Sequence, residues 1–300
     1  MSPEAKEVPL TGKPHAIDLL TATIKDLQEC LSNGTITTVQ MVKEYLARIE
    51  ANNRKGLELR AVMETAPTDD LLAIARSLDE MRNKGKLMGK LHGIPLLVKD
   101  SIGTEPKLGM LTTAGSYALV NSIPAEDATV IAKLRAAGAI ILGKATMTQL
   151  GNYKSSQAHM GWSARGGQGQ SAYVSGGYPK ADPEGSSSGS AIAVSAGWAP
   201  AALRTETCGS LTGPAGKAAE YTVRSTVGLV SRHGVVPASS RLDTVGPLMK
   251  STYDAAILLE CMSGYDAKDP ASRYRGQSWS LVRYSPRLKS LQPMYSKEKK

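Results

Sequence analysis

The stretch GSSSGSAIAVSAGWAPAALRTETCGS, residues 185–210, decides the fold because it joins a helical pattern to a strand pattern. Small and apolar residues over 188–197 predict a helix, and residues 198–206 predict the strand that follows it. The same order recurs over residues 126–144, where Gly138 separates a helix at about 127–137 from an apolar strand. Repeated alternation of this kind predicts an α/β fold, with helices covering a largely parallel or mixed sheet.

The N-terminal part of the chain predicts two helices joined by a short turn. In residues 16–34 the apolar residues recur at helical spacing from Leu19 and Leu20 onward, and Asn33-Gly34 is a typical C-terminal cap. Residues 35–53 place apolar side chains around one face of a second helix, with Thr38 as its expected N-cap.

Three further segments complete the expected organisation. Residues 67–86 predict a third helix that ends near Gly85, and GIPLLVKD (93–100) predicts a short strand buried on both faces. The glycine-rich residues 160–185 predict a loop. We expect a flexible N-terminus over 1–16, one domain over 17–271 with N-terminal helices (17–85) and a catalytic core (90–271), and an irregular tail over 272–300.

The length, charge and composition of the chain exclude several classes of protein. The chain has 300 residues, of which 41% are hydrophobic, and this length suffices for a large core. Its formal net charge of +9 is spread along the sequence, so nucleic acid is not an expected direct partner. Three cysteines without a CxxC pair and four scattered histidines predict no metal site. No stretch approaches the roughly 18 apolar residues of a membrane span, so we expect a cytoplasmic protein without a membrane partner.

The serine-rich stretch also carries candidate chemistry. Ser186 and Ser210 are separated by one helix and one strand, so the fold can bring them together at the ends of two elements. A flexible linker would not run into ordered elements, and the run lacks the lysine of a phosphate-binding loop. Cys208 and Gly209 before Ser210 suit a turn whose backbone N–H groups face one point, as in an oxyanion hole, although a simple turn has the same composition.

A nucleophilic serine needs a base, and the histidines fit this role less well than a lysine. His92 and His233 fall in no pattern that ties them to Ser210. Lys99 ends an apolar strand, where burial would lower its pKa from the usual value of about 10.4. A simple ion pair between Lys99 and Asp100 at the strand end is the alternative.

Several motifs together resemble the amidase signature family. They are LHGIPLLVKDSI (91–102), TTAGSYAL (112–119), GAIILGKATMTQL (138–150), the stretch over 185–215 and LDTVGPLMKSTYDAAILL (242–259). The resemblance is to a fungal-type amidase related to the A-type subunit of glutamyl-tRNA(Gln) amidotransferase. It implies an α/β/α sandwich with a mixed central sheet covered by helices, here expected to be C-terminally truncated because the likeness fades after about residue 272.

The resemblance also implies a Ser-cisSer-Lys triad. Carried over by position, Lys99 is the base, Ser186 is the bridging serine after a cis peptide bond from Gly185, and Ser210 is the nucleophile that forms an acyl-enzyme. Amide groups from four consecutive residues would form the oxyanion hole: Thr207, Cys208, Gly209 and Ser210. A small-molecule amide is the expected substrate, no metal or organic cofactor is needed, and a homodimer is an open alternative.

The sequence departs from the family's pattern at three positions around the nucleophile. Arg204 stands where the family has a glycine, Cys208 stands where it has Gly or Asp, and Thr212 stands where it often has an arginine. The leading hypothesis is an amidase that hydrolyses a carboxylic amide C–N bond. The alternatives are a glutaminase like the A-type subunit of a tRNA-dependent amidotransferase, and an inactive truncated relative that acts as a binding protein.

Overall fold

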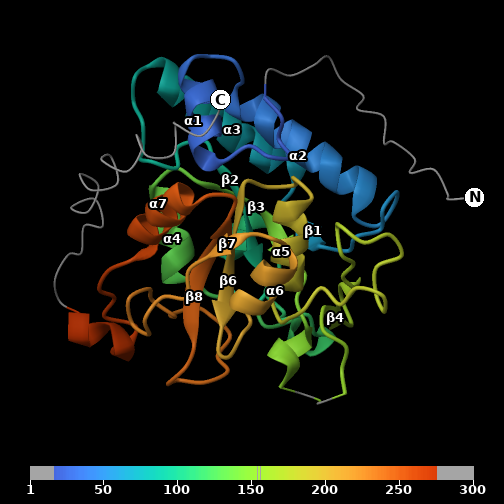
Figure 1. Ribbon diagram of the computed structural model, residues 1–300. Coiled ribbons are helices and arrows are strands. Elements are labelled where there is room, and N and C mark those ends of the chain that lie inside the picture. Colours follow the sequence, from blue (N-terminus) through green and yellow to red (C-terminus); the bar gives the residue numbers. More distant parts are fainter. Residues whose placement is uncertain (1–16, 154, 156, 276–300) are drawn as a thin grey trace, which may run out of the picture.

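A mixed six-stranded sheet forms the centre of the molecule. The computed structural model describes residues 17–153, 155 and 157–275, and Figure 1 shows these in colour. Across the sheet the strands follow the order β1-β3-β2-β6-β8-β7. Their bounds are Val62–Thr65 (β1), Pro95–Lys99 (β2), Ile140–Ala145 (β3), Ala201–Glu206 (β6), Tyr221–Thr222 (β7) and Thr244–Met249 (β8).

The three central strands, β3, β2 and β6, are parallel, and the strands on either side of them are antiparallel to their neighbours. β2 runs parallel to β3 and to β6, whereas β1 pairs with β3, β8 with β6, and β7 with β8 in antiparallel fashion. All five residues of β2 are buried, as the continuous apolar run predicts for a strand covered on both faces. The sheet is therefore mixed, which confirms the prediction of a largely parallel or mixed sheet.

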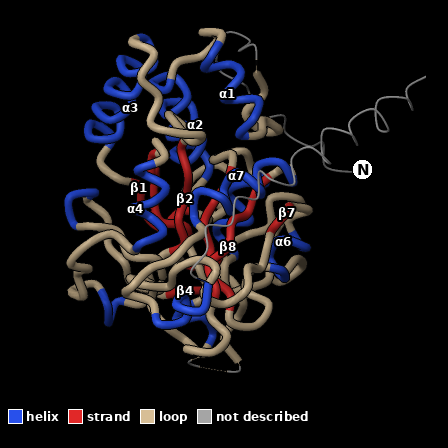
Figure 2. Tube along the Cα trace, turned by 90° about the vertical axis from the view of Figure 1, so that its left-hand side faces the viewer, coloured by secondary structure: helices blue, strands red, loops and turns tan. Residues whose placement is uncertain are grey.

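Helices cover this sheet. α5 packs against β1, β2, β3, β6 and β8, and α6 packs beside it, whereas α4 and α7 pack together on the opposite side. Figure 2, viewed from that opposite side, shows α4 and α7 in front of the strands and α1, α2 and α3 gathered at one end. The bounds are Ile24–Ser32 (α1), Thr38–Asn52 (α2), Thr68–Asn83 (α3), Thr129–Ala136 (α4), Ser188–Ser195 (α5), Thr212–Lys217 (α6) and Thr252–Met262 (α7).

Short elements fill the connections. Short 3₁₀ segments occur at Pro106–Leu108, Tyr117–Leu119, Gln149–Asn152, which is kinked at Leu150 and Gly151, and Pro270–Arg275. In the region expected to be a loop, residues 160–185, the only regular structure among the residues described is a two-residue hairpin of β4 (Trp162–Ser163) and β5 (Gly167–Gln168). Residues 1–16 and 276–300 lie outside the described part of the chain, and with them most of the two expected terminal segments.

The helix α5 is enclosed by the rest of the fold. Its residues from Ser188 to Val194 are all buried. At Gly189 an added Cβ would lie 2.5 Å from both the N and the O of Thr146, which shows how closely α5 approaches β3. The small residues of the serine-rich stretch therefore let a helix pack tightly against the sheet.

Two expected helix starts need correction. α1 begins at Ile24 and not near Leu19, because Thr23 and Asp26 form a reciprocal capping box there. The N-cap of α2 is Thr37 and not Thr38, since the Thr37 hydroxyl accepts from the N–H of Gln40. The expected C-terminal cap at Asn33-Gly34, the third helix and the strand β2 are found as predicted.

Several elements have no counterpart among the sequence predictions, among them β1, α6, β7, β8 and α7. β1 lies between α2 and α3, and β8 and α7 follow the nucleophile region. β1 has only four residues, and its burial pattern does not alternate, so neither length nor period marks it. Among the residues described, no helix is long and apolar enough to cross a membrane.

Candidate active site

Three side chains from separate segments form one hydrogen-bonded line. Lys99 Nζ lies 2.8 Å from Ser186 Oγ, and Ser186 Oγ lies 3.0 Å from Ser210 Oγ. Lys99 is the last residue of β2, Ser186 lies just before α5, and Ser210 lies in the turn between β6 and α6. The predicted base, bridge and nucleophile are thus adjacent, although 87 and 24 residues separate the bonded pairs in sequence.

The backbone shapes both serine-bearing turns. The peptide bond between Gly185 and Ser186 is cis, as the family resemblance implies. In the second turn Gly209 has a φ of +82°, a left-handed conformation that favours glycine just before the nucleophile. Ser186 and Ser210 project toward one another, since their Oγ atoms lie 3.0 Å apart.

The environment of Lys99 favours a neutral amine. Its side chain is fully buried, and Nζ contacts Thr205 through the carbonyl (3.3 Å) and Oγ1 (3.0 Å). Burial, reinforced by the positive charge of Arg204, lowers the pKa of Lys99 to about 7, although Asp243 and Glu206 oppose the shift. A lysine of this pKa is partly deprotonated near neutral pH and can accept a proton.

The alternative, an ion pair between Lys99 and Asp100, is not found among the described residues. Asp100 accepts hydrogen bonds from the Thr113 hydroxyl and from Gly115 N, at 2.8 Å for the latter. Burial outweighs these bonds and raises the pKa of Asp100. The two neighbouring residues thus take part in separate networks.

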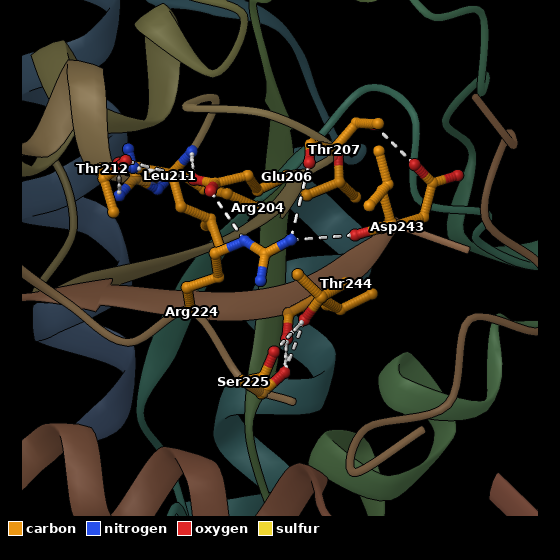
Figure 3. Close-up of polar contacts among 12 residues, drawn as sticks. Arg204, Glu206, Thr207, Leu211, Thr212, Arg224, Ser225, Asp243 and Thr244 are labelled. Carbon is orange, nitrogen blue, oxygen red and sulfur yellow. Dashed lines mark hydrogen bonds and ion pairs between the residues drawn. The ribbon is translucent and has the colours of Figure 1, made fainter. Parts of the chain in front are cut away.

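The segment after β6 is held by two carboxylates that the sequence did not single out. Glu206 Oε2 accepts from Leu211 N at 2.7 Å and from Thr212 N at 3.0 Å, and Asp243 Oδ1 accepts from the Thr207 hydroxyl. Figure 3 shows these contacts around the nucleophile turn. The Thr207–Asp243 bond joins residues 36 positions apart, and the partners of Glu206 lie in the sharp turn that follows β6, so no local motif marks these two residues.

The departures from the family pattern occupy distinct environments. Arg204 is fully buried opposite Gly246 of β8, and Arg204 Nη2 donates to Leu211 O at 2.8 Å. Burial lowers the pKa of Arg204 to about 9. Cys208 is exposed, and Thr212 is exposed beside Glu206, which it contacts through its N–H. The arginine side chain thus extends into the core instead of crowding the nucleophile.

A cavity of about 520 Å³ opens over the two serines. Polar residues line it around the catalytic line, including Thr207, Asp243 and an Arg232–Asp269 ion pair, while apolar residues form other parts of its wall. The apolar lining residues include Ala114, Met147, Leu150, Val235, Val236 and Pro237. The cavity can therefore hold an organic group next to Ser210.

His92 and His233 lie outside the hydrogen-bonded line. His92 is buried and contacts Leu78 O and Met88 N, while His233 lines the cavity and pairs with Glu126. Within the described residues, no three His, Cys, Asp or Glu side chains gather in a way that could hold a metal ion. A lysine is thus the base candidate that contacts a serine here.

Known proteins resemble this chain in sequence. The family model named Amidase matches residues 40–291. A putative amidase of Arthroderma benhamiae is 42% identical over 280 residues, which cover 85% of this chain and 45% of that protein. The A-type subunit of the Chloroflexus aurantiacus glutamyl-tRNA(Gln) amidotransferase is 38% identical over 253 residues, which cover 83% of this chain and 48% of that protein.

A solved structure extends the likeness to the fold. Native peptide amidase from Stenotrophomonas maltophilia matches with a TM-score of 0.81 and 41% identity, covering 92% of this chain and 53% of that one. The chain thus spans about half the length of the relatives that it matches. With a family model that covers most of its length and relatives above 30% identity, the chain belongs to the amidase signature family.

Proposed function

We propose that this chain carries the catalytic centre of an amidase, which hydrolyses a carboxylic amide C–N bond through Lys99, Ser186 and Ser210. The observation that carries the proposal is the continuous line from Lys99 Nζ through Ser186 Oγ to Ser210 Oγ, with distances of 2.8 and 3.0 Å. A hydroxyl both donates and accepts hydrogen bonds, so such a line can pass a proton from the nucleophile to the amine.

The proposed reaction begins with a proton transfer along this line. Neutral Lys99 accepts a proton from Ser186 while Ser186 accepts one from Ser210, and Ser210 Oγ forms a bond to the amide carbonyl carbon. The carbonyl oxygen becomes an oxyanion, which backbone N–H groups from the turn around Ser210 stabilise. Of the four candidates, Thr207, Cys208, Gly209 and Ser210, the Gly209 N–H interacts with Glu206 instead, which leaves the other three for this role.

The second half returns the enzyme to its starting state. The C–N bond breaks as the relay delivers the proton to the leaving nitrogen, which departs as an amine or ammonia. A water molecule then attacks the Ser210 ester, gives its proton to the relay and releases the carboxylic acid. Lys99 and both serines end in the protonation states in which they began.

A fluorophosphonate probe tests the nucleophile directly. We expect the full 300-residue chain to be labelled at Ser210, the Ser210→Ala variant to remain unlabelled, and peptide mass spectrometry to locate the adduct. Ser195→Ala is a matched control, because Ser195 is a half-buried serine at the far end of α5 whose hydroxyl donates to Ile192 O. Labelling that persists in Ser210→Ala, or no labelling of the parent chain, would count against the proposed function.

The likeness to the A-type subunit of an amidotransferase supports a second candidate, a glutaminase that acts within a larger assembly. Ammonia release from glutamine that appears only when partner subunits are added would favour it over a free-standing amidase. Release of ammonia from simple carboxylic amides by the chain alone would favour the amidase.

A further inference from the structure

The guanidinium of Arg224 occupies a central place beside the nucleophile turn. Arg224 Nε forms a 2.8 Å ion pair with Glu206 Oε1, and Arg224 Nη2 donates to Leu242 O at 3.1 Å and to Thr207 O at 3.5 Å. Figure 3 shows the guanidinium between Glu206 on one side and the Thr207–Asp243 contact on the other. One side chain thus connects the end of β6, the start of the turn and the segment before β8.

Glu206 transmits this contact to the far end of the turn. Its side chain is only 4% exposed, and Oε2 accepts from Leu211 N and Thr212 N while Oε1 faces Arg224. Burial on its own raises the pKa of Glu206, but the N–H groups of Leu211, Thr212 and Gly209, together with Arg224, hold the pKa below its usual range. The carboxylate therefore stays ionised and keeps its bonds to the residues that follow Ser210.

Arg224 also acts on the start of the turn. The carbonyl that it contacts belongs to the peptide between Thr207 and Cys208. In a planar trans peptide the C=O and the N–H point in opposite directions, so a guanidinium that holds the Thr207 carbonyl also sets the direction of the Cys208 N–H. The same peptide is fixed from its side chain by the hydrogen bond between Thr207 and Asp243.

We propose that Arg224 is a positioning residue for the nucleophile turn, holding residues 207–212 so that Ser210 and the N–H of Cys208 keep the orientation that acylation requires. This role rests on the proposed function, in which those groups take part in amide hydrolysis. Arg224 touches no reacting atom in it, because it acts through Glu206 and the Thr207–Cys208 peptide.

The test compares three variants of the full chain. Arg224→Met removes the charge and all donors, Arg224→Lys keeps the charge without the fork of donors, and Arg76→Met is a matched control on the exposed face of α3. We expect Arg224→Met to lower the maximal rate constant of fluorophosphonate acylation about tenfold while the half-saturating probe concentration stays the same, since orientation and not probe affinity is lost. Arg224→Lys should recover part of that rate, and Arg76→Met should match the parent chain.

Hydrogen–deuterium exchange of the peptide covering residues 207–212 provides a readout that does not depend on activity. Arg224→Met should speed exchange of the N–H groups bound to Glu206 by about tenfold, whereas Arg76→Met should leave them unchanged. Unchanged exchange together with an unchanged acylation rate would overturn the positioning role. If the parent chain is not acylated at all, the proposed function fails, and the exchange comparison alone then supports or overturns the role of Arg224.

Discussion

Lys99 illustrates how one residue can be costly for the fold and useful for chemistry. It is completely buried, and its amine contacts Ser186 and Thr205 and not a carboxylate. Burial and Arg204 lower the pKa of Lys99 to about 7. Because the folded chain binds this proton less tightly than the unfolded chain, Lys99 makes the fold less stable as the pH falls from its usual pKa of 10.5 toward 7.

The pH dependence of acylation follows from the same shift. Only neutral Lys99 can accept the proton from Ser186, so the rate of fluorophosphonate labelling should rise with pH and reach half its maximum near the folded pKa of about 7. Below that midpoint the rate should fall about tenfold per pH unit. Labelling rates measured from pH 5 to 9 check this, and a flat profile would show that Lys99 is not the base.

We expect the Arg204 side chain to lower the free energy of unfolding. Its Nε and Nη1 atoms are buried and have no hydrogen-bond partner among the described residues, and the side chain is fully enclosed. Replacing it by methionine removes a buried charge and two unpaired donor atoms, while Leu211 O still accepts from Ala215 N at 3.3 Å, so Arg204→Met should raise the free energy of unfolding by about 1–2 kcal/mol.

Urea denaturation measures this change, with Arg165→Met as the control. Arg165 is also largely buried but contacts Thr113 and Glu64, so its loss should destabilise the chain. Because the charge of Arg204 lowers the pKa of Lys99, Arg204→Met should also move the midpoint of the acylation profile to higher pH. Destabilisation by Arg204→Met would refute this interpretation.

At the scale of elements, α5 links the serine-rich stretch to the sheet. Its buried residues contact five of the six strands, and its N-terminal end directly follows Ser186. Any displacement of this helix from β3 therefore also moves the bridging serine relative to Lys99.

Gly189→Ala should show this dependence. The added methyl would lie within 2.5 Å of backbone atoms of Thr146, which cannot move aside as a side chain can, so we expect a loss of about 2–4 kcal/mol in the free energy of unfolding. Gly216→Ala is the control in α6, where an added methyl meets no atom of the described residues within 4 Å. Denaturant titration of both variants checks the prediction, and equal stabilities would show that the α5–β3 contact is not tight.

Motifs and periodicity predicted the elements that carry the hydrogen-bonded line of Lys99, Ser186 and Ser210, but not their full surroundings. The apolar runs around 93–99 and 198–206 mark β2 and β6, and the quoted motifs mark Lys99, Ser186 and Ser210. Glu206, Arg224 and Asp243 were not predicted because the Glu206–Arg224 ion pair and the Thr207–Asp243 hydrogen bond join different segments of the chain. Such partners depend on how β8 inserts beside β6, which no local pattern encodes.

At the scale of the whole molecule, one carboxylate ties the two ends of the described chain together. Asp254, in the first turn of α7, accepts from Ile24 N at 2.9 Å and from Lys25 N at 3.2 Å, so it caps α1 from 230 residues away. Burial raises the pKa of Asp254 even though these N–H groups oppose the shift. The start of α1 is thereby attached to the start of α7.

Asp254→Ala should release this attachment. Losing two hydrogen bonds to helix N–H groups should cost about 1–3 kcal/mol of unfolding free energy and speed hydrogen exchange in α1. Asp254→Asn keeps one acceptor and should lose less, while the exposed Asp70→Ala in α3 serves as the control. If α1 exchanges no faster in Asp254→Ala, the cap does not hold the helix.

The hydrogen-bonded line joins residues that lie 87 and 24 positions apart in sequence. The proposed reactivity of Ser210 therefore depends on contacts between separate parts of the chain. Contacts of high sequence separation form late, because closing long loops costs entropy before the contacts repay it. During refolding, Ser210 should therefore become reactive toward acylation only when the sheet is complete. Before that point the chain contains Ser210, but Lys99 does not yet lie beside it.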